Sequence, residues 1–341
     1  MQSQLIESEQ AFSEQVERFI AQYWLNAAEP RLRLRAWLNE VDTEPLRKQW
    51  YRSVVEAGWS VPHWPSEFGG CDWSPQQLHI WLSACLKHQT PTVLTFATGH
   101  VGPLLIEYGT ADQQALLPQI AALEDNWCLG WVERSAPIND YSIGARITQN
   151  GQQTSVSGTK ARVIDGMRAH WMMCIAVPEE SRVDDNKPSI VLIPMDQNGI
   201  ERAPKAALST GQPMAEIVMT DALVPAWGTL NVSVGELRER LSGLAESDPS
   251  GLVDGAALTV QVQRLKAQLQ DDPNMEQGVL RDCDALAIEV MGLLGMEQRA
   301  TAAVKDVEEE LPRALVRLRA QALWAKLSEL QIVAFGYYAL P

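Results

Sequence analysis

One acidic residue stands where a strand would present it to a loop, and it is the first candidate for chemistry. Glu133 follows the apolar stretch Trp127–Val132, and a turn-rich segment with Pro137, Asn139 and Asp140 comes after it. A carboxylate in that position can act as a general base when its surroundings adjust its affinity for protons. The same acid can instead serve as a structural acceptor of hydrogen bonds from the loop.

The histidines and cysteines do not form the patterns that nucleophilic catalysis or metal binding requires. The five histidines show no pairing with Cys or Ser that would activate a nucleophile. The five cysteines are scattered without a Cys-x-x-Cys pair, whereas a structural zinc site needs close pairs. We therefore expect no metal, and reduced, mostly buried thiols that are typical of a cytoplasmic protein.

Length and charge narrow the class of protein further. The 341 residues suffice for two or three structural units with substantial cores. The formal net charge of −15 argues against nucleic acid or an anionic membrane surface as a partner, because both attract clustered Lys and Arg. No apolar run approaches the roughly 20 residues of a membrane span, and the polar, acidic N-terminal segment does not resemble a signal peptide.

The spacing of apolar residues divides the chain into three regions. Residues 1–125 and 231–341 show helical spacing, whereas the period changes to two between 126 and 230. Asn150-Gly151 lies between alternating segments and predicts a β-hairpin. Other predicted strands are Met172–Val177, Ile190–Pro194 and Ala215–Met219, and the predicted C-terminal helices are Val260–Leu269, Cys283–Leu294 and Ala314–Ile332. These regions predict an α+β fold with an N-terminal helical domain, a middle antiparallel β-domain and a C-terminal helical domain.

Three stretches resemble the acyl-CoA dehydrogenase family. The loop Ala57–Gly70 resembles the family's Gly-Trp, Pro and Trp-Pro-Glu-Tyr-Gly-Gly pattern, and His100–Ile120 resembles its Gly-Pro, Tyr-Gly-Thr and Leu-Pro pattern. Trp131–Gly166 resembles a strand that ends in Glu-Pro and leads to a Gly-Thr-Lys corner. The resemblance extends from about residue 40 to 341 and weakens beyond about 230. It implies the family's fold with a shortened C-terminal helical bundle, FAD as the cofactor and an acyl-CoA as the substrate.

The reaction implied by the resemblance is α,β-dehydrogenation of an acyl-CoA thioester. A carboxylate removes the α-proton while the β-hydrogen leaves as a hydride to the flavin. When Ser328–Gln331 is aligned with the family's C-terminal motif, Ala325 stands at the position of this base. Alanine cannot accept a proton, so the resemblance predicts no catalytic residue in this chain. Glu329 is then interpreted as a solvated or capping acid beside a helix.

The positions that contact the flavin ring in the family are also altered. Arg162 and Ile164 replace the Trp and Thr of the family's Trp-Ile-Thr motif, so an aromatic wall and a hydroxyl group are both lost. We expect Arg162 to form a surface salt bridge. Glu133 coincides with an acid that the family does not usually use as the base, which favours the structural role. The resemblance makes these three residues vestiges of a flavin site.

A glycine-rich motif that meets the adenosine end of a neighbouring subunit's flavin has a partial counterpart here. Its best match is Glu289–Gly295, in which Glu replaces Gln and Leu replaces the second Gly. An acid repels a pyrophosphate, and a leucine blocks close approach of the backbone. We therefore expect tight helix packing at Gly292 and Gly295. The alternative is that Glu289, Gly292 and Gly295 contact the adenosine end of a partner's FAD.

Framework motifs are kept while site motifs are lost, which favours a non-catalytic subunit of a heteromeric FAD-dependent acyl-CoA dehydrogenase. By resemblance, the catalytic subunit would hold the base and the main flavin site, two heterodimers would form a heterotetramer, and an electron-transfer flavoprotein would accept the electrons. The expected substrate is a bulky acyl-CoA from fatty acid or steroid catabolism, with a steroid side-chain thioester as the analogy. Two alternatives stay open: a self-sufficient flavoenzyme with a relocated base at Glu133 or Glu107, and a non-enzymatic scaffold or binding protein of the same fold.

Overall fold

The chain forms two compact units, each of which gathers segments that are distant in the sequence. The first contains Met1–Glu56, Cys71–Thr92 and Gly243–Pro341, and the second contains Ala57–Gly70 and Val93–Ser242. The computed structural model describes residues 2–37, 41–133, 144–179, 188–205, 214–233, 235, 253–270, 277–302 and 310–335. The predicted domain boundaries at residues 125 and 230 stay predictions.

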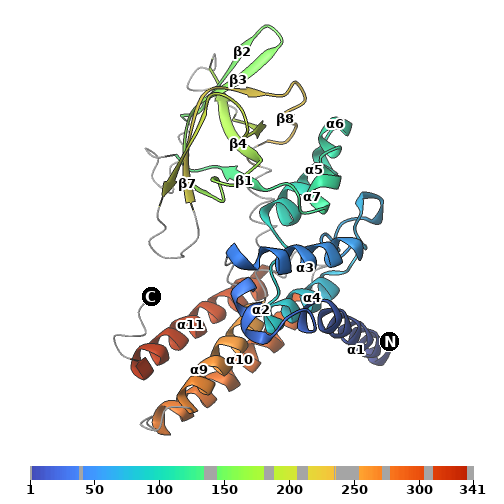
Figure 1. Cartoon of the computed structure of the whole chain (residues 1–341), viewed down its shortest axis with the longest axis vertical. Coiled ribbons are helices and arrows are strands. Elements are labelled where there is room, and N and C mark those ends of the chain that lie inside the picture. Colours follow the sequence, from blue (N-terminus) through green and yellow to red (C-terminus); the bar gives the residue numbers. More distant parts are fainter. Residues whose placement is uncertain are drawn as a thin grey trace. The chain divides into compact units, whose positions relative to one another are not determined.

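The described part of the first unit is helical. Its helices are α1 (Gln2–Ile20), α2 (Pro30–Trp37), α3 (Glu44–Glu56), α4 (Pro75–His88), α9 (Asp254–Gln270), α10 (Gln277–Ala302) and α11 (Glu310–Phe335), with short helical turns η1 (Ala21–Leu25) and η2 (Val41–Thr43). The three predicted C-terminal helices fall inside α9, α10 and α11, which lie side by side (Figure 1). The sequence therefore located each helix but placed its ends too far inward.

Aromatic side chains hold the N-terminal helices of this unit together. The rings of Trp24, Trp50 and Trp81 follow one another with centroid separations of 5.7 and 5.9 Å. All three side chains are buried, and the indole nitrogens of Trp24 and Trp50 donate to the carbonyl oxygens of His88 and Pro91. Because the polar edge of these two indoles is satisfied, the apolar rings can be fully buried.

The C-terminal helices of the first unit share a separate apolar core. On α10, the core residues Cys283, Leu286, Val290 and Leu293 recur every three or four residues. The core residues of α11 repeat in the same way, at Val316, Ala320, Leu323 and Leu327. Since these rows lie on one side of each helix, their burial determines which side faces away from the core.

The second unit combines short helices with a sheet. Its helical segments are η3 (Ser66–Phe68), η4 (Ala97–Val101), α5 (Gly102–Tyr108), α6 (Ala111–Gln114) and α7 (Leu117–Ala121). Its strands are β1 (Trp127–Gly130), β2 (Arg146–Asn150), β3 (Gln153–Ile164), β4 (Trp171–Pro178), β5 (Ser189–Pro194), β6 (Ile200–Lys205), β7 (Met214–Val224) and β8 (Thr229–Leu230). The predicted hairpin at Asn150-Gly151 is confirmed, because β2 and β3 pair across this turn and Gly151 has a positive φ of 64°.

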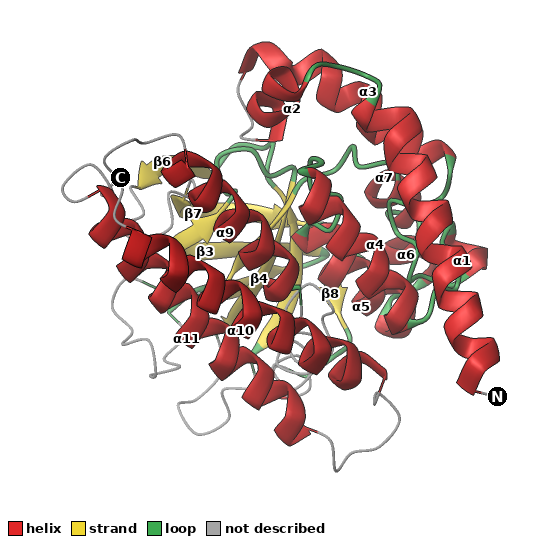
Figure 2. Cartoon of the chain, turned by 90° about the horizontal axis from the view of Figure 1, so that it is seen from below, coloured by secondary structure: helices red, strands yellow, loops and turns green. Residues whose placement is uncertain are grey.

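The sheet is mixed, and not purely antiparallel as the sequence predicted. Its order is β6-β7-β3-β2-β4-β5-β8, with β1 paired to β4. Figure 2 labels β6, β7, β3, β4 and β8 of this sheet. Strand β4 runs parallel to both β1 and β2, whereas the other pairs are antiparallel. Parallel neighbours need a long connection, and the hairpin of β2 and β3 lies within the connection from β1 to β4. Because β1 and β4 are far apart in the sequence, their pairing leaves no local signal from which it could be predicted.

The match to an α+β fold is otherwise confirmed. The described chain shows helices before the sheet, a central sheet and helices after it. Among the described helices, none is both long enough and apolar enough to cross a membrane.

A close contact between Trp64 and Gly102 joins the loop Ala57–Gly70 to the helices of the second unit. The buried Trp64 indole donates to the carbonyl oxygen of Thr98 at 2.9 Å. A Cβ atom added at Gly102 would lie 1.8 Å from Cζ2 of this ring. Only glycine leaves room for the indole here. The loop Ala57–Gly70 and the stretch His100–Ile120 therefore depend on each other through this contact.

We predict that Gly102→Ala destabilises the protein by about 3 kcal/mol, because neither the buried ring nor the helix can move away without strain. Chemical denaturation of the full chain measures this change. Gly99→Ala is the matched control, since its nearest contact would be a Leu94 side-chain atom at 3.4 Å. Equal stability losses in the two variants would show that the Trp64 contact does not matter.

Candidate functional site

Glu133 is a buried structural acid in the second unit. The residue is 6% exposed, and its Oε1 accepts a hydrogen bond from Lys160 Nζ at 2.6 Å. Oε1 also accepts from the backbone nitrogen of Ala145 at 3.1 Å, and Oε2 accepts from that of Gly144. Since both oxygens already accept from fixed donors, the carboxylate serves to hold the chain after β1 against β3.

Lys160 explains why the Gly158-Thr159-Lys160 corner matters. Its side chain is fully buried, although lysine is almost never buried unless it is paired. The pair with Glu133 supplies that partner and connects two parts of the same stretch that are 27 positions apart. The sequence identified the corner as a framework motif but missed this ion pair, for which a lysine at an inward-facing strand position was the available signal.

The positions of the family's flavin contacts lie on an irregular part of β3. The pairing of β3 with β7 shifts between Lys160 and Val163, and Arg162 within this bulge has a positive φ of 52°. Arg162 is exposed, and Ile164 is 46% exposed. The expected surface salt bridge of Arg162 is not found, because no ion pair joins it to another described residue. The bulge turns a cation and an apolar side chain toward solvent.

The other proposed base, Glu107, lies near the end of α5. Its side chain is exposed at the surface of the second unit. The remaining positions predicted around this site, from Arg134 to Asp140, lie outside the described residues.

Glu289 on α10 is bound by two cations from α11. Its Oε2 accepts from Arg319 at 2.6 Å, and Lys326 Nζ lies 2.8 Å from the same oxygen. These contacts lower the pKa of Glu289, with the Lys326 hydrogen bond as the largest favourable cause. Glu289 together with Arg319 and Lys326 carries a net charge of +1. The negative charge of Glu289 is therefore compensated, and this group of three side chains does not repel an anion.

The expectation of tight packing at Gly292 and Gly295 is wrong. A Cβ atom added at either glycine would meet no atom within 4 Å in the described part of the chain. On the same side of α10, Ile288 and Met291 are 69% and 70% exposed. Ile288, Met291 and Gly292 follow helical spacing and form one row that the described residues leave exposed, whereas Gly295 also lines a cavity of the first unit.

Ala325, which the resemblance predicts at the position of the family's base, lies on the exposed side of α11. Its neighbours along the chain, Leu323 and Leu327, are buried in the core, and α11 is helical from Glu310 to Phe335. Glu329 is also exposed. An uninterrupted helix holds both residues in fixed directions, so neither can swing into a site on the buried side.

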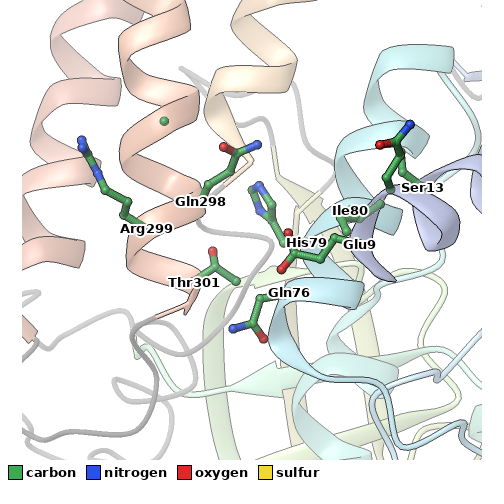
Figure 3. Close-up of a pocket in the computed structure, with 10 residues that line it drawn as sticks. Glu9, Ser13, Gln76, His79, Ile80, Gln298, Arg299 and Thr301 are labelled. Carbon is green, nitrogen blue, oxygen red and sulfur yellow. The ribbon is translucent and has the colours of Figure 1, made fainter. Parts of the chain in front are cut away.

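The first unit contains a polar cavity of 470 Å³ between α1, α4 and α10 (Figure 3). Its polar lining includes Glu9, Ser13, Gln76, His79, Gln298 and Thr301. In Figure 3 the His79 ring extends from α4 toward Gln298. Burial lowers the pKa of His79, and its Nδ1 has no hydrogen-bond partner among the described atoms. The cavity therefore suits water or a small polar molecule that can satisfy this nitrogen.

A second buried acid, Glu297, lies on the core side of α10. Oε1 accepts from the backbone nitrogen of Gly255 at 2.9 Å, whereas Oε2 is buried without a partner among the described atoms. Burial raises the pKa of Glu297 to about 8. The sequence analysis missed this residue, although its spacing from Val290 and Leu293 places it on their face of the helix.

No metal centre is found in the described residues, where no three His, Cys, Asp or Glu side chains gather closely enough to hold an ion. The cysteines are free, with four buried and Cys71 partly exposed.

Comparison with known proteins shows what the chain is similar to. Residues 6–124 match the acyl-CoA dehydrogenase N-terminal domain. Over these residues the chain is similar to the acyl-CoA dehydrogenases. Over 192 residues it is 28% identical to acyl-CoA dehydrogenase IpdE1 of Mycolicibacterium smegmatis, a match that covers 53% of this chain and only 49% of that relative. The predicted resemblance is thereby confirmed.

Solved structures confirm the fold over nearly the whole chain. A structure described as the Tcur3481-Tcur3483 steroid ACAD superimposes with a TM-score of 0.77 and 18% identity, covering 96% of this chain and 85% of the other. The ChsE4-ChsE5 complex from Mycobacterium tuberculosis gives a TM-score of 0.76 and 15% identity, covering 98% and 86%. Identities this low establish the acyl-CoA dehydrogenase fold and not the activity.

The flavin contacts of acyl-CoA dehydrogenases fit this chain poorly at the ring and better at the far end. Ile164 has no hydroxyl group, and Arg162 supplies no aromatic wall. The row with Gly292 is open, and the charge of Glu289 is compensated. The assignments at these positions stay predictions.

We predict that Lys160→Met destabilises the protein by about 3–5 kcal/mol, because it leaves the buried Glu133 carboxylate without its cation. Urea denaturation of the full chain measures the loss. The double variant Glu133→Gln with Lys160→Met should lose less than the sum of the single variants, since it leaves no unpaired charge. Additive losses would contradict a direct interaction.

We predict that Glu297→Gln raises the stability at pH 7 by about 2 kcal/mol. Below about pH 4.5 the acid is protonated in both states, so it has no effect on stability there. As the pH rises toward 8, the unfolded state releases this proton while the folded state retains it, and stability falls. Denaturation of both proteins at pH 4 and pH 7 should show a difference only at pH 7, and a difference of equal size at both would contradict the buried acid.

Proposed function

We propose that this chain is the non-catalytic subunit of a heteromeric FAD-dependent acyl-CoA dehydrogenase. The partner subunit supplies the base and the main flavin site, and the complex carries out α,β-dehydrogenation of a bulky acyl-CoA. FAD accepts the hydride in this reaction. This chain contributes the fold, one side of the subunit contact and the outer part of the cofactor site. An electron-transfer flavoprotein is the proposed electron acceptor of the complex.

The observation that carries the proposal is the position of Ala325. It replaces the acid that removes the α-proton, and it lies on the exposed side of a helix that continues without a break on both sides. General base catalysis needs a carboxylate within hydrogen-bond reach of the reacting carbon. A methyl group on a rigid helix cannot perform this step, and its exposed neighbour Glu329 is fixed on the same helix.

The other acids of the chain support the same conclusion. Glu133 is buried and accepts hydrogen bonds at both oxygens. To act as a base that takes a proton from the substrate, this carboxylate would have to break its pair with Lys160. A relocated base at this position is therefore disfavoured by the geometry.

The similar solved structures support a two-protein assembly. Both structures described above carry the names of two proteins, and one of them is described as a steroid ACAD. These descriptions favour a heteromeric complex and a bulky, steroid-like acyl group for this chain as well. A substrate of that size also accounts for two chains that together enclose one working site.

The uncovered row on α10 supports contact with the partner's cofactor. Gly292 allows close approach of the backbone, and the exposed Ile288 and Met291 gain from burial against another chain. We propose that Glu289, Gly292 and Gly295 lie near the adenosine end of the FAD that the partner holds.

We predict one FAD for each pair of subunits. Co-expression with an acyl-CoA dehydrogenase encoded beside this chain should yield a yellow heteromer, with a native mass that fits two heterodimers. Flavin absorbance, divided by the protein concentration, measures the ratio.

The purified chain alone is the control, and it should contain no stoichiometric FAD and should not reduce a dye with an acyl-CoA. Stoichiometric FAD together with dye reduction by the chain alone would refute the proposed function. A colourless chain that joins no dehydrogenase would favour a scaffold protein.

A further inference from the structure

Helix α11 has apolar residues on two nearly opposite sides. One side carries Val316, Ala320, Leu323 and Leu327, which pack into the core with α9 and α10. The other side carries Leu315, Leu318, Ala322, Ala325 and Ile332, which are exposed. At about 100° per residue, these two rows point in directions that differ by more than a right angle. A helix that is apolar on both sides is expected to be covered on both.

The exposed row has the spacing of a coiled-coil seam, and we call it the α11 seam. It consists of Leu315, Leu318, Ala322, Ala325, Glu329 and Ile332, separated by three and four residues in strict alternation. This repeat places every member on one stripe that matches a second helix at a small crossing angle. Figures 1 and 2 show α11 as one straight element beside α10, so the stripe is continuous along it.

The exposure of this seam is large for residues of its type. Leu318 is 62% exposed, and Leu315 and Ile332 are each 51% exposed. Burial of such side chains against another surface contributes roughly 25 cal/mol for each Å² of apolar area. Ala322 and Ala325, in the centre of the seam, are small enough to let another helix approach closely.

The charges on the seam identify the kind of helix that fits it. Glu329 is an acid at an otherwise apolar seam position, which requires a cation or a polar group opposite to it. Arg319 and Lys326 lie along one flank, where they share the carboxylate of Glu289. With a net charge of +1, this flank favours an acidic residue on the opposing helix.

A second copy of this chain meets these requirements poorly. In a parallel pair of α11 helices, Glu329 would oppose its own copy. In an antiparallel pair centred on Ala322 and Ala325, Glu329 would lie against Leu318, and its charge would be buried against an apolar group. The antiparallel arrangement also brings the two basic flanks together.

We propose that the α11 seam is the docking surface for one helix of the catalytic partner subunit, with apolar seam residues, a basic residue opposite Glu329 and acidic residues along the Arg319 flank. This inference rests on the proposed function and adds to it the element through which the subunits pair. Position 325 then has a role of its own, because an alanine there allows a helix to approach where the family places a base.

The test compares variants of the full chain that is co-expressed with the neighbouring dehydrogenase subunit. Leu318→Glu should weaken the pairing at least about tenfold, because it places a charge among the apolar residues of the contact. Leu32→Glu is the matched control, since Leu32 lies on α2 of the same unit and is 39% exposed. It should leave the affinity within about twofold. Circular dichroism confirms that both variants fold, and analytical ultracentrifugation measures the affinity.

Each other outcome overturns the inference. If Leu318→Glu pairs as tightly as the wild type, the seam is not the contact, while a count of one FAD per pair still supports the proposed function. If the wild-type chain alone is a dimer that Leu318→Glu dissociates, a second copy occupies the seam. If the wild type joins no dehydrogenase subunit and binds FAD by itself, the proposed function fails together with its docking surface.

Discussion

Burial of one apolar row on α11 determines what the end of this chain can do. Val316, Ala320, Leu323 and Leu327 pack against α9 and α10, and a regular helix then fixes the direction of every other side chain along it. Ala325 is held on the outside, in line with other exposed apolar residues. An alanine side chain there offers no oxygen or nitrogen atom that could accept a proton.

A second fixed interaction holds part of the framework in the second unit. The buried pair of Glu133 and Lys160 ties the end of β1 to β3. Removal of one partner of such a buried ion pair strongly destabilises the protein, whereas replacement of both partners by apolar residues often changes its stability little. The pair therefore constrains both residues together, and it does not depend on the exposed Arg162 and Ile164. The framework and the chemistry depend on different residues, so one can change without the other.

Local signals in the sequence predicted much of this fold. Asn150-Gly151 gave the hairpin because only a few residue types adopt its turn, and the three- and four-residue spacing of apolar side chains located α9, α10 and α11. The parallel pairing of β4 with β1 was not predictable, since it depends on contacts between distant segments. The openness of Gly292 was also missed, because a glycine in a helix has the same sequence signature whether it is packed or exposed.

The assignment of position 325 stays a prediction from the resemblance, and the fold adds only what surrounds this position. Alignment of Ser328–Gln331 showed that no acid stands at position 325, yet it gave no reason for an alanine there. The seam that runs through Ala325 is visible in the spacing of Leu315, Leu318 and Ile332, but the buried row is equally visible. Only the fold distinguishes the row that is covered by this chain from the row that is left for another.

The central claim is that a pair of subunits has one working site, supplied with its base by the partner. Anaerobic titration of the purified heteromer with its acyl-CoA tests this claim most directly, because loss of flavin absorbance counts the sites that can oxidise the substrate. The account predicts that reduction is complete at one equivalent of acyl-CoA for each pair of subunits. Reduction that continues to two equivalents, or reduction by this chain alone, would contradict it.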